Sequence, residues 1–94
     1  IDEILGVEGL DAILIGPYDL SASLGQSGDF DNEEFKSALI SIKEKCNMSK
    51  IPCGIHVVEA SEDELKDKIA QGYRFIPYSL DTVILRTFLD NPIK

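Results

Sequence analysis

The sequence predicts an α/β fold in which parallel strands alternate with helices. Two observations support this prediction. Short apolar runs of the length of buried strands recur three times in the 94 residues, and segments with apolar residues at helical spacing separate and follow them. Strands and helices that alternate in this way form right-handed βαβ units around a parallel sheet. We therefore expect residues 1–94 to belong to one α/β domain, with functional groups at the carboxyl ends of its strands.

The first βα unit contains a sharp turn. Ile1, Ile4 and Leu5 have helical spacing and indicate the end of a helix already under way, so we expect the chain to be an excerpt of a longer protein. The run AILI at 12–15 predicts a strand buried on both faces. Gly16 and Pro17 end this strand, and about one helical turn follows before the flexible loop GQSGDFDN at 25–32.

A longer helix is predicted over residues 33–46. Asp31 and Glu34 have the spacing of a capping box at its start. Its apolar residues fall on one helical face and are Phe35, Ala38, Leu39, Ile42 and Cys46.

The second unit begins with a predicted strand at 52–57. Ser61 and Glu64 then form a capping box, and the helix that they open ends at Gly72, a typical residue after a helix C-terminus.

The third predicted strand, at 74–79, contains Pro77, which favours an edge, a bulge or the end of a strand because proline lacks an N–H group. The last helix follows Asp81 and Thr82, and residues 90–94 form a loose terminus. The apolar residues expected to face inward from this helix are Ile84, Leu85, Phe88 and Leu89.

The composition excludes several classes of function. Seventeen acidic residues against nine basic ones give a net charge of −8, which argues against nucleic acid as a partner because no basic stripe is present. No apolar run approaches the roughly 18 residues of a membrane span. Cys46 and Cys53 do not form a CxxC pair, and with a single His they exclude a Cys/His zinc site and indicate free thiols in a reducing cytoplasm.

Polar residues follow each predicted strand, at 16–21, 56–59 and 80–82. Asp19 has two interpretations: the N-cap of a short helical turn that begins at Leu20, or a carboxylate ligand for a hard cation such as Mg²⁺ or Mn²⁺. His56 is either a core histidine or a substrate contact. Asp81 favours an N-cap over a ligand. Ser21, without a histidine at a recognisable spacing, does not indicate a nucleophile.

One block is more specific than general βα patterns. The segment VEGLDAILIGPYDLSASLG at 7–25, together with GIHV at 54–57 and GYRFIPYSLDTVIL at 72–85, resembles the HpcH/HpaI aldolase family of metal-dependent class II pyruvate aldolases. The resemblance covers essentially the whole chain. It implies a TIM (β/α)8 barrel, of which residues 1–94 supply the three C-terminal βα units of a single barrel domain.

The resemblance also implies roles for individual residues. Asp19 corresponds to a ligand of a divalent metal, Mg²⁺, Mn²⁺ or Co²⁺, and Tyr18 to a main-chain contact with the pyruvate carboxylate in a turn shaped by Gly16. His56 and Leu80 correspond to substrate-contacting positions that tune specificity. The family's catalytic Arg, its acid–base pair and its Glu metal ligand lie upstream, so none of the catalytic residues is within this segment.

The activity that the resemblance implies is reversible retro-aldol cleavage of a 4-hydroxy-2-oxo acid to pyruvate and an aldehyde, through a metal-stabilised enolate. The partners are then a small 2-oxo acid and an aldehyde in a cytoplasmic homo-oligomer whose C-terminal helix lies at the subunit interface. The isolated segment is expected to be inactive. Two alternatives stay open: a non-catalytic remnant that oligomerises to cover its sheet edges, and an acyl-CoA lyase similar to the citrate lyase β subunit.

Overall fold

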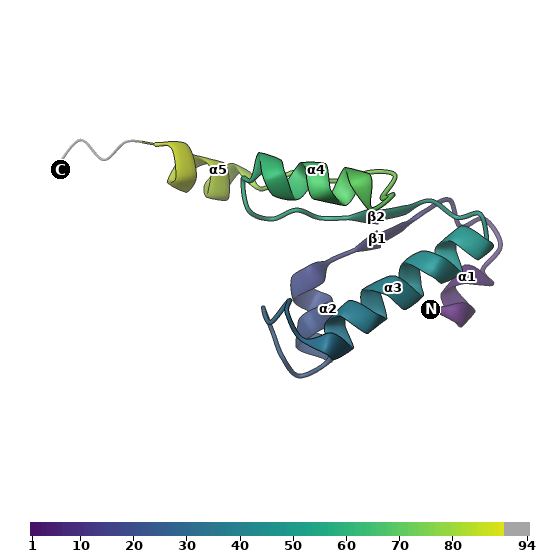
Figure 1. Cartoon of the computed structure of the whole chain (residues 1–94). Coiled ribbons are helices and arrows are strands. Elements are labelled where there is room, and N and C mark those ends of the chain that lie inside the picture. The colour runs from purple at the N-terminus through teal and green to yellow at the C-terminus, as the bar shows by residue number, and fades with distance from the viewer. Residues whose placement is uncertain (90–94) are drawn as a thin grey trace.

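The computed structural model describes residues 1–89 and contains two short parallel strands with helices before, between and after them (Figure 1). In Figure 1 the strands lie side by side, and α5 projects beyond α4 toward the C-terminal end. The elements are α1 (Asp2–Leu5), β1 (Ile13–Ile15), α2 (Pro17–Ser23), α3 (Glu33–Met48), β2 (Cys53–Ile55), α4 (Glu62–Ala70) and α5 (Asp81–Phe88).

β1 and β2 form a parallel pair with Ile13 opposite Cys53 and Ile15 opposite Ile55. α3 connects these strands and packs against β2, which completes a βαβ unit. The α/β class and the parallel pairing are therefore confirmed. The two strands lie within the predicted ranges 12–15 and 52–57 but are shorter.

The core lies between α3 and one face of this sheet. Its buried members are Ile15, Cys46, Cys53, Ile55 and Tyr73, and partly buried Leu39 and Ile42 from α3 pack against them. The apolar face predicted for α3 is confirmed, since Phe35 and Cys46 are buried and Ala38, Leu39 and Ile42 are partly buried.

The opposite face of the sheet is open among the described residues. Leu14 is 52% exposed, whereas Ile15, its neighbour on the other face, is 5% exposed. The prediction that residues 12–15 are buried on both faces is therefore wrong for this chain, because α3 covers one face and no described element covers the other.

Residues 74–79 run beside β2 without forming a regular strand. The Ile55 N–H donates to the Phe75 carbonyl at 3.3 Å, and the Val57 N–H donates to the Pro77 carbonyl at 3.0 Å. Pro77 has no N–H to return to the Ile55 carbonyl, and Ser79 leaves the extended region with φ at 57°. The predicted third strand is therefore wrong as a continuous strand, and only isolated parallel bridges remain.

The helix starts test the capping predictions. Asn32, not Asp31, caps α3, because its side-chain oxygen accepts hydrogen bonds from the N–H groups of Glu34 and Phe35. Ser61 caps α4 as predicted, accepting from Glu64 N–H at 3.2 Å. The last residue of α4 is Ala70 and its C-cap is Gln71, and Gly72 follows with φ at 93°, as expected for a glycine after a helix C-terminus.

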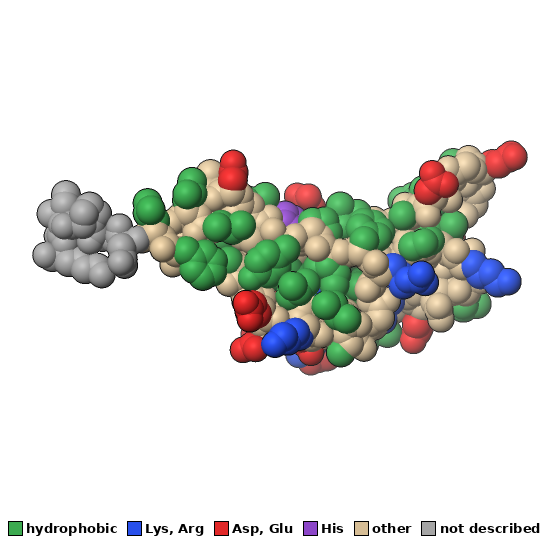
Figure 2. Space-filling view, turned by 90° about the horizontal axis from the view of Figure 1, so that it is seen from above, with side chains coloured by type: hydrophobic (Ala, Val, Ile, Leu, Met, Phe, Trp, Pro, Cys, Tyr) green, Lys and Arg blue, Asp and Glu red, His purple; other side chains and the backbone are tan. Residues whose placement is uncertain are grey.

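The prediction for the last helix is wrong in its packing. α5 has no buried residue, and the side chains expected to face inward are exposed, at 38% for Ile84, 59% for Leu85 and 69% for Phe88. The spacing identified an apolar face correctly, but no described element packs on it. Figure 2 shows hydrophobic side chains over much of this view of the surface, from α5 to the middle of the molecule. Residues 90–94, predicted as a loose terminus, lie outside the described residues.

Among residues 1–89, no helix is both long and apolar enough to cross a membrane.

Candidate metal and substrate site

The Gly16–Asp19 turn follows β1 directly and opens α2. Gly16 is the N-cap with an extended backbone, and Pro17 occupies the first helical position, where its missing N–H has no cost. The Leu20 N–H donates to the Gly16 carbonyl at 2.9 Å. Asp19 therefore lies inside the first turn, and the interpretation of Asp19 as the N-cap of a helix starting at Leu20 is wrong. The fixed φ of proline starts the helix earlier.

The Asp19 carboxylate is exposed and has no hydrogen bond or ion pair with another side chain in the part of the chain that is described. Carboxylate oxygens at such a position suit a hard divalent cation. No group of three or more His, Cys, Asp or Glu side chains within residues 1–89 could hold a metal ion by itself. Asp19 is thus a single available ligand rather than a complete site.

Two neighbours hold the turn in place. The Tyr18 ring packs edge-on against Phe30, with ring centroids 5.0 Å apart, so the side chain is directed to the loop that precedes α3. The buried Ser21 hydroxyl donates to the Tyr18 carbonyl at 3.0 Å and accepts from the Gly28 N–H at 2.9 Å. Ser21 therefore has a structural role, consistent with the expectation that it is not a nucleophile.

At the end of β2, the His56 ring bonds to the main chain of Ser79. The His56 Nε2 lies 2.9 Å from the Ser79 carbonyl oxygen. Ser79 is 5% exposed, has φ at 57°, and its buried hydroxyl has no hydrogen-bond partner among the described residues. Buried polar atoms without partners and non-glycine residues at positive φ are both uncommon, so this position is unusual on two counts.

The sheet brings three of the predicted positions to one edge. Because Ile15 pairs with Ile55, Gly16 follows β1 beside His56, and the His56 N–H donates to the Ile15 carbonyl at 3.1 Å. A bridge between Val57 and Tyr78 brings residues 79 and 80 to the same edge. The juxtaposition of strand ends expected from the sequence is therefore present.

Leu80 and Asp81 lie at the start of α5. Leu80 is the N-cap position and is 47% exposed. Asp81 is the first helical residue, and its side chain accepts a hydrogen bond from the Thr82 N–H at 2.7 Å. The prediction that Asp81 is the N-cap is wrong by one position.

The family model for HpcH/HpaI aldolase/citrate lyase matches residues 1–87. The chain belongs to the HpcH/HpaI family. Its sequence is 33% identical over 87 residues to a hydroxypyruvate/pyruvate aldolase of Sagittula stellata, which covers 93% of this chain and 34% of that protein. It is 32% identical over 90 residues to a 2-keto-3-deoxy-L-rhamnonate aldolase of Escherichia coli, and the match covers 96% of this chain and 33% of that protein.

Solved structures agree with the sequence matches. An HpcH/HpaI aldolase/citrate lyase family protein from Burkholderia cenocepacia superposes with a TM-score of 0.83 at 27% identity, covering 92% of this chain and 33% of that one. An HpcH/HpaI aldolase from Desulfitobacterium hafniense superposes with a TM-score of 0.81 at 25% identity, covering 93% of this chain and 33% of that one. This HpcH/HpaI chain therefore spans about a third of the length of the relatives that it matches.

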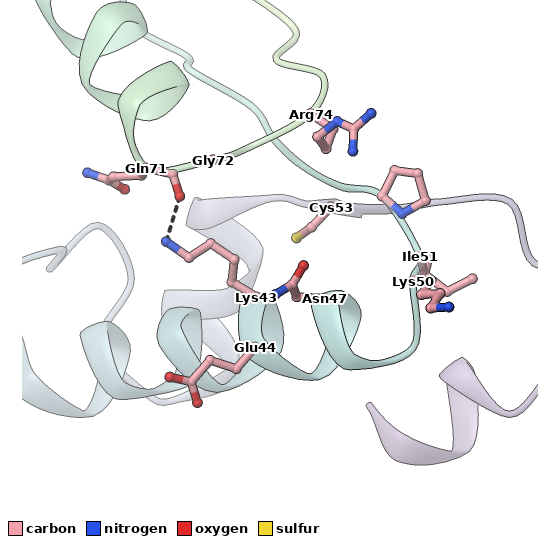
Figure 3. Close-up of a pocket in the computed structure, with 10 residues that line it drawn as sticks. Lys43, Glu44, Asn47, Lys50, Ile51, Cys53, Gln71, Gly72 and Arg74 are labelled. Carbon is pink, nitrogen blue, oxygen red and sulfur yellow. Dashed lines mark hydrogen bonds between the residues drawn. The ribbon is translucent and has the colours of Figure 1, made fainter.

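A cavity of the HpcH/HpaI chain lies at the opposite, amino-terminal edge of the strands and has a volume of about 450 Å³ (Figure 3). Lys43, Lys50 and Arg74 line it, but Figure 3 shows their charged ends directed to different places. The Lys43 ammonium donates to the Gln71 carbonyl at 2.8 Å. The three cations therefore do not converge on one point where an anion could bind.

The two cysteines are buried and free, as predicted. Burial, and then the neighbouring Cys46, raise the pKa of the Cys53 thiol to about 12. A thiol that stays protonated is a poor nucleophile and a poor metal ligand. Cys53 is therefore a core residue, and Cys46, 1% exposed, belongs to the same buried cluster.

The sequence did not point to Ser79 or to the bonding of Ser21. A serine within an apolar run carries no local signal for a positive φ, since that conformation is imposed by the hydrogen bonds of the neighbouring strand. The GPYDLSASLG block also gave no sign of the hydrogen bond between the Ser21 hydroxyl and the Gly28 N–H.

Proposed function

We propose that the full-length protein is a metal-dependent pyruvate aldolase that reversibly cleaves a 4-hydroxy-2-oxo acid to pyruvate and an aldehyde. The observation that carries the proposal is the available Asp19 carboxylate on the first turn of α2, in a chain of the HpcH/HpaI family. The aldolase names of its relatives support cleavage of a carbon–carbon bond.

In this proposal Asp19 is one ligand of Mg²⁺, Mn²⁺ or Co²⁺. Its carboxylate oxygens fit such a cation because they are exposed and not engaged with other side chains. A further ligand has to come from outside residues 1–89, since a single carboxylate does not hold a divalent cation firmly. When bound, the cation would supply Lewis-acid stabilisation of negative charge on the keto oxygen of pyruvate.

The chain's own groups would bind and orient the substrate. The main chain of Gly16 and Tyr18, held by Ser21 and the Phe30 contact, faces the 2-oxo acid in this proposal. His56 and Leu80, which follow the neighbouring segments at the same edge, contact the aldehyde half. The catalytic proton-transfer groups are proposed to lie outside this segment.

The same proposal includes the architecture of the whole protein. β1 and β2 are two parallel strands of a barrel domain, with residues 74–79 as the neighbouring, proline-interrupted strand, and other strands close the sheet. The exposed apolar residues of α5, among them Leu85 and Phe88, pack against a second copy of the chain. This copy would cover the helix face that no described element covers.

The family description also includes citrate lyase, so cleavage of an acyl-CoA ester is the competing activity. The names of the relatives favour the free-acid aldolases. A direct comparison of a hydroxy-oxo acid with its CoA-ester counterpart separates the two activities.

The proposal is tested with the full-length protein by the aldol addition of pyruvate to an aldehyde, before and after metal removal with EDTA. We expect activity that is lost with EDTA and restored by Mg²⁺, Mn²⁺ or Co²⁺. Asp19→Asn removes the carboxylate charge with little change in shape, and we expect it to lower kcat/KM by about 100-fold or more, as for a group that acts in the transition state.

Asp63→Asn is the matched control, because Asp63 is exposed on α4 and lies outside the proposed site. Its activity should equal that of the unchanged protein. Metal-independent activity, or an Asp19→Asn variant as active as this control, would contradict the proposed metal-dependent function, and a full-length protein without any activity would favour a non-catalytic role for the segment.

A further inference from the structure

Gly16 lies where a side chain would meet the Asp19 carboxylate. A Cβ atom at Gly16 would be 3.1 Å from the Asp19 Oδ2 and 3.8 Å from the Asp19 Cβ and Cγ, its nearest atoms outside the neighbouring residues. Ordinary contacts of a Cβ atom begin at 3.4 Å. The Asp19 side chain therefore occupies space that a side chain at position 16 would need.

The main chain at Gly16 does not itself require glycine. Its φ of −94° and ψ of 105° lie in the extended region, which alanine adopts without strain and which a residue before proline prefers. Gly25 and Gly28, by contrast, have φ at 80°, so at those positions the reason for glycine is conformational. At position 16 the reason is the room that glycine leaves for the Asp19 carboxylate.

The contact with Gly16 also determines on which side of the sheet the Asp19 carboxylate lies. Gly16 directly follows β1, and side chains along an extended segment point alternately to the two faces of a sheet. Ile15 belongs to the core under α3, so position 16 faces the same side as the exposed Leu14. The carboxylate next to Gly16 therefore lies at the end of β1, toward the face that no described element covers.

No other described group holds the carboxylate in this direction. No hydrogen bond joins it to the Gly16 N–H or to a side-chain donor among residues 1–89. The main chain of the turn is fixed independently, since the Leu20 N–H donates to the Gly16 carbonyl and the Ser21 hydroxyl donates to the Tyr18 carbonyl. A methyl group at position 16 would thus leave the turn in place and displace the carboxylate.

We propose that Gly16 is a positioning residue, which leaves the Asp19 carboxylate the place from which it binds the divalent cation. The inference rests on the proposed function, in which Asp19 is a metal ligand. Metal sites require ligand distances within about 0.2 Å of their usual values. Relief of the 3.1 Å contact moves the carboxylate by a few tenths of an ångström, which is enough to weaken such a site.

The test measures the Kd of Mn²⁺ for the full-length protein by calorimetry, without pyruvate, so that contact of the new methyl group with substrate cannot affect the result. We expect Gly16→Ala to raise this Kd by about 10-fold, as other residues that orient a metal ligand do. Urea unfolding of the metal-free protein should show no loss of stability. The exposed carboxylate can move aside there, and alanine reduces the entropy of the unfolded chain.

Gly6→Ala is the matched control. It adds the same methyl group at a negative φ, and the nearest atoms would be at 3.5 and 3.6 Å, which are ordinary contacts. Gly6 caps α1, which lies near the C-terminal end of α3, whereas α2 lies near its start (Figure 1). The Kd of Mn²⁺ for this control should stay within twofold of that for the unchanged protein.

Asp19→Asn separates this inference from the proposed function. If Asp19→Asn weakens Mn²⁺ binding and activity while Gly16→Ala binds Mn²⁺ within twofold of the unchanged protein, the inference is overturned and the proposed function stands. A metal-free Gly16→Ala variant that is less stable than the unchanged protein also overturns the inference, since the glycine would then serve the fold. If Asp19→Asn binds Mn²⁺ as tightly as the unchanged protein, both proposals fail together.

Discussion

At the residue scale, Ser79 combines two features that destabilise a folded protein. Its hydroxyl is buried without a partner among residues 1–89, and its backbone has a positive φ. Ser79→Gly removes both costs, which outweigh the extra chain entropy of glycine, so we expect the free energy of unfolding to rise by about 1 kcal/mol. Urea unfolding of the full-length protein measures this change. Ser79→Ala, which removes only the hydroxyl, should gain less, and a glycine variant less stable than the unchanged protein would contradict the account.

Cys53 gives the fold a dependence on alkaline pH. Burial, and then Cys46, raise the pKa of its thiol from 9.0 to about 12 in the folded protein. Between these values the folded state keeps a proton that the unfolded state loses. The stabilisation of the folded state by the protonated Cys53 thiol is therefore complete below about pH 9, and it is lost as the pH rises toward 12.

The measurement is the free energy of unfolding at pH 8 and at about pH 10. Cys53→Ala should reduce the fall in stability between the two values. The fall should not disappear, because burial also raises the pKa of Tyr73 to about 12, with the same sign. An alanine variant with an unchanged pH dependence would show that Cys53 does not contribute.

Single residues were predictable where the chemistry is local. Proline after glycine marked the end of β1, whereas Asp19 lies within α2 rather than at its cap. The conformation of Ser79 could not be predicted, since it depends on hydrogen bonds to Val57 and His56, more than twenty residues away.

At the scale of elements, the contact between β2 and the following segment depends on Gly54. A Cβ atom at this position would lie 2.6 Å from the Phe75 ring and from the Phe75 carbonyl oxygen. Gly54→Ala should therefore push residues 74–79 away from β2 and lower the free energy of unfolding by about 2 kcal/mol. Gly6→Ala is the control, because its nearest neighbours would be at 3.5 Å, an ordinary contact. Equal stability of the two variants, measured by urea unfolding, would contradict the close packing.

The periodicity of the sequence predicted the helices better than their surroundings. For α3 the apolar face and its burial were both correct, because the covering sheet lies within the same segment. For α5 the face exists but stays exposed, since spacing does not reveal what covers a helix. The prediction of a third strand was wrong because Pro77, within a run of strand-forming residues, has no main-chain N–H to donate to β2.

At the scale of the whole molecule, the alternation of strands and helices was sufficient to predict the α/β class and the parallel pairing. The family could be predicted as well, because the specific block at 7–25 lies within the chain, and the family model matches residues 1–87. The remainder of the site was not predictable from these residues. The chain spans about a third of its relatives, and the groups that would complete a metal site with Asp19 are not among residues 1–89.

The pairing of β1 with β2 also bears on how fast the segment can fold. Ile13 meets Cys53 across the sheet, so each ladder contact joins residues that are far apart along the chain. Closing such a loop loses chain entropy before any strand contact forms, which makes parallel pairing slow compared with helix formation. α3 shortens the distance, because its sixteen residues are compact once helical and carry the buried face onto which both strands can condense. From the amphipathic helix between the strands we therefore expect α3 to form first and the sheet to assemble on it.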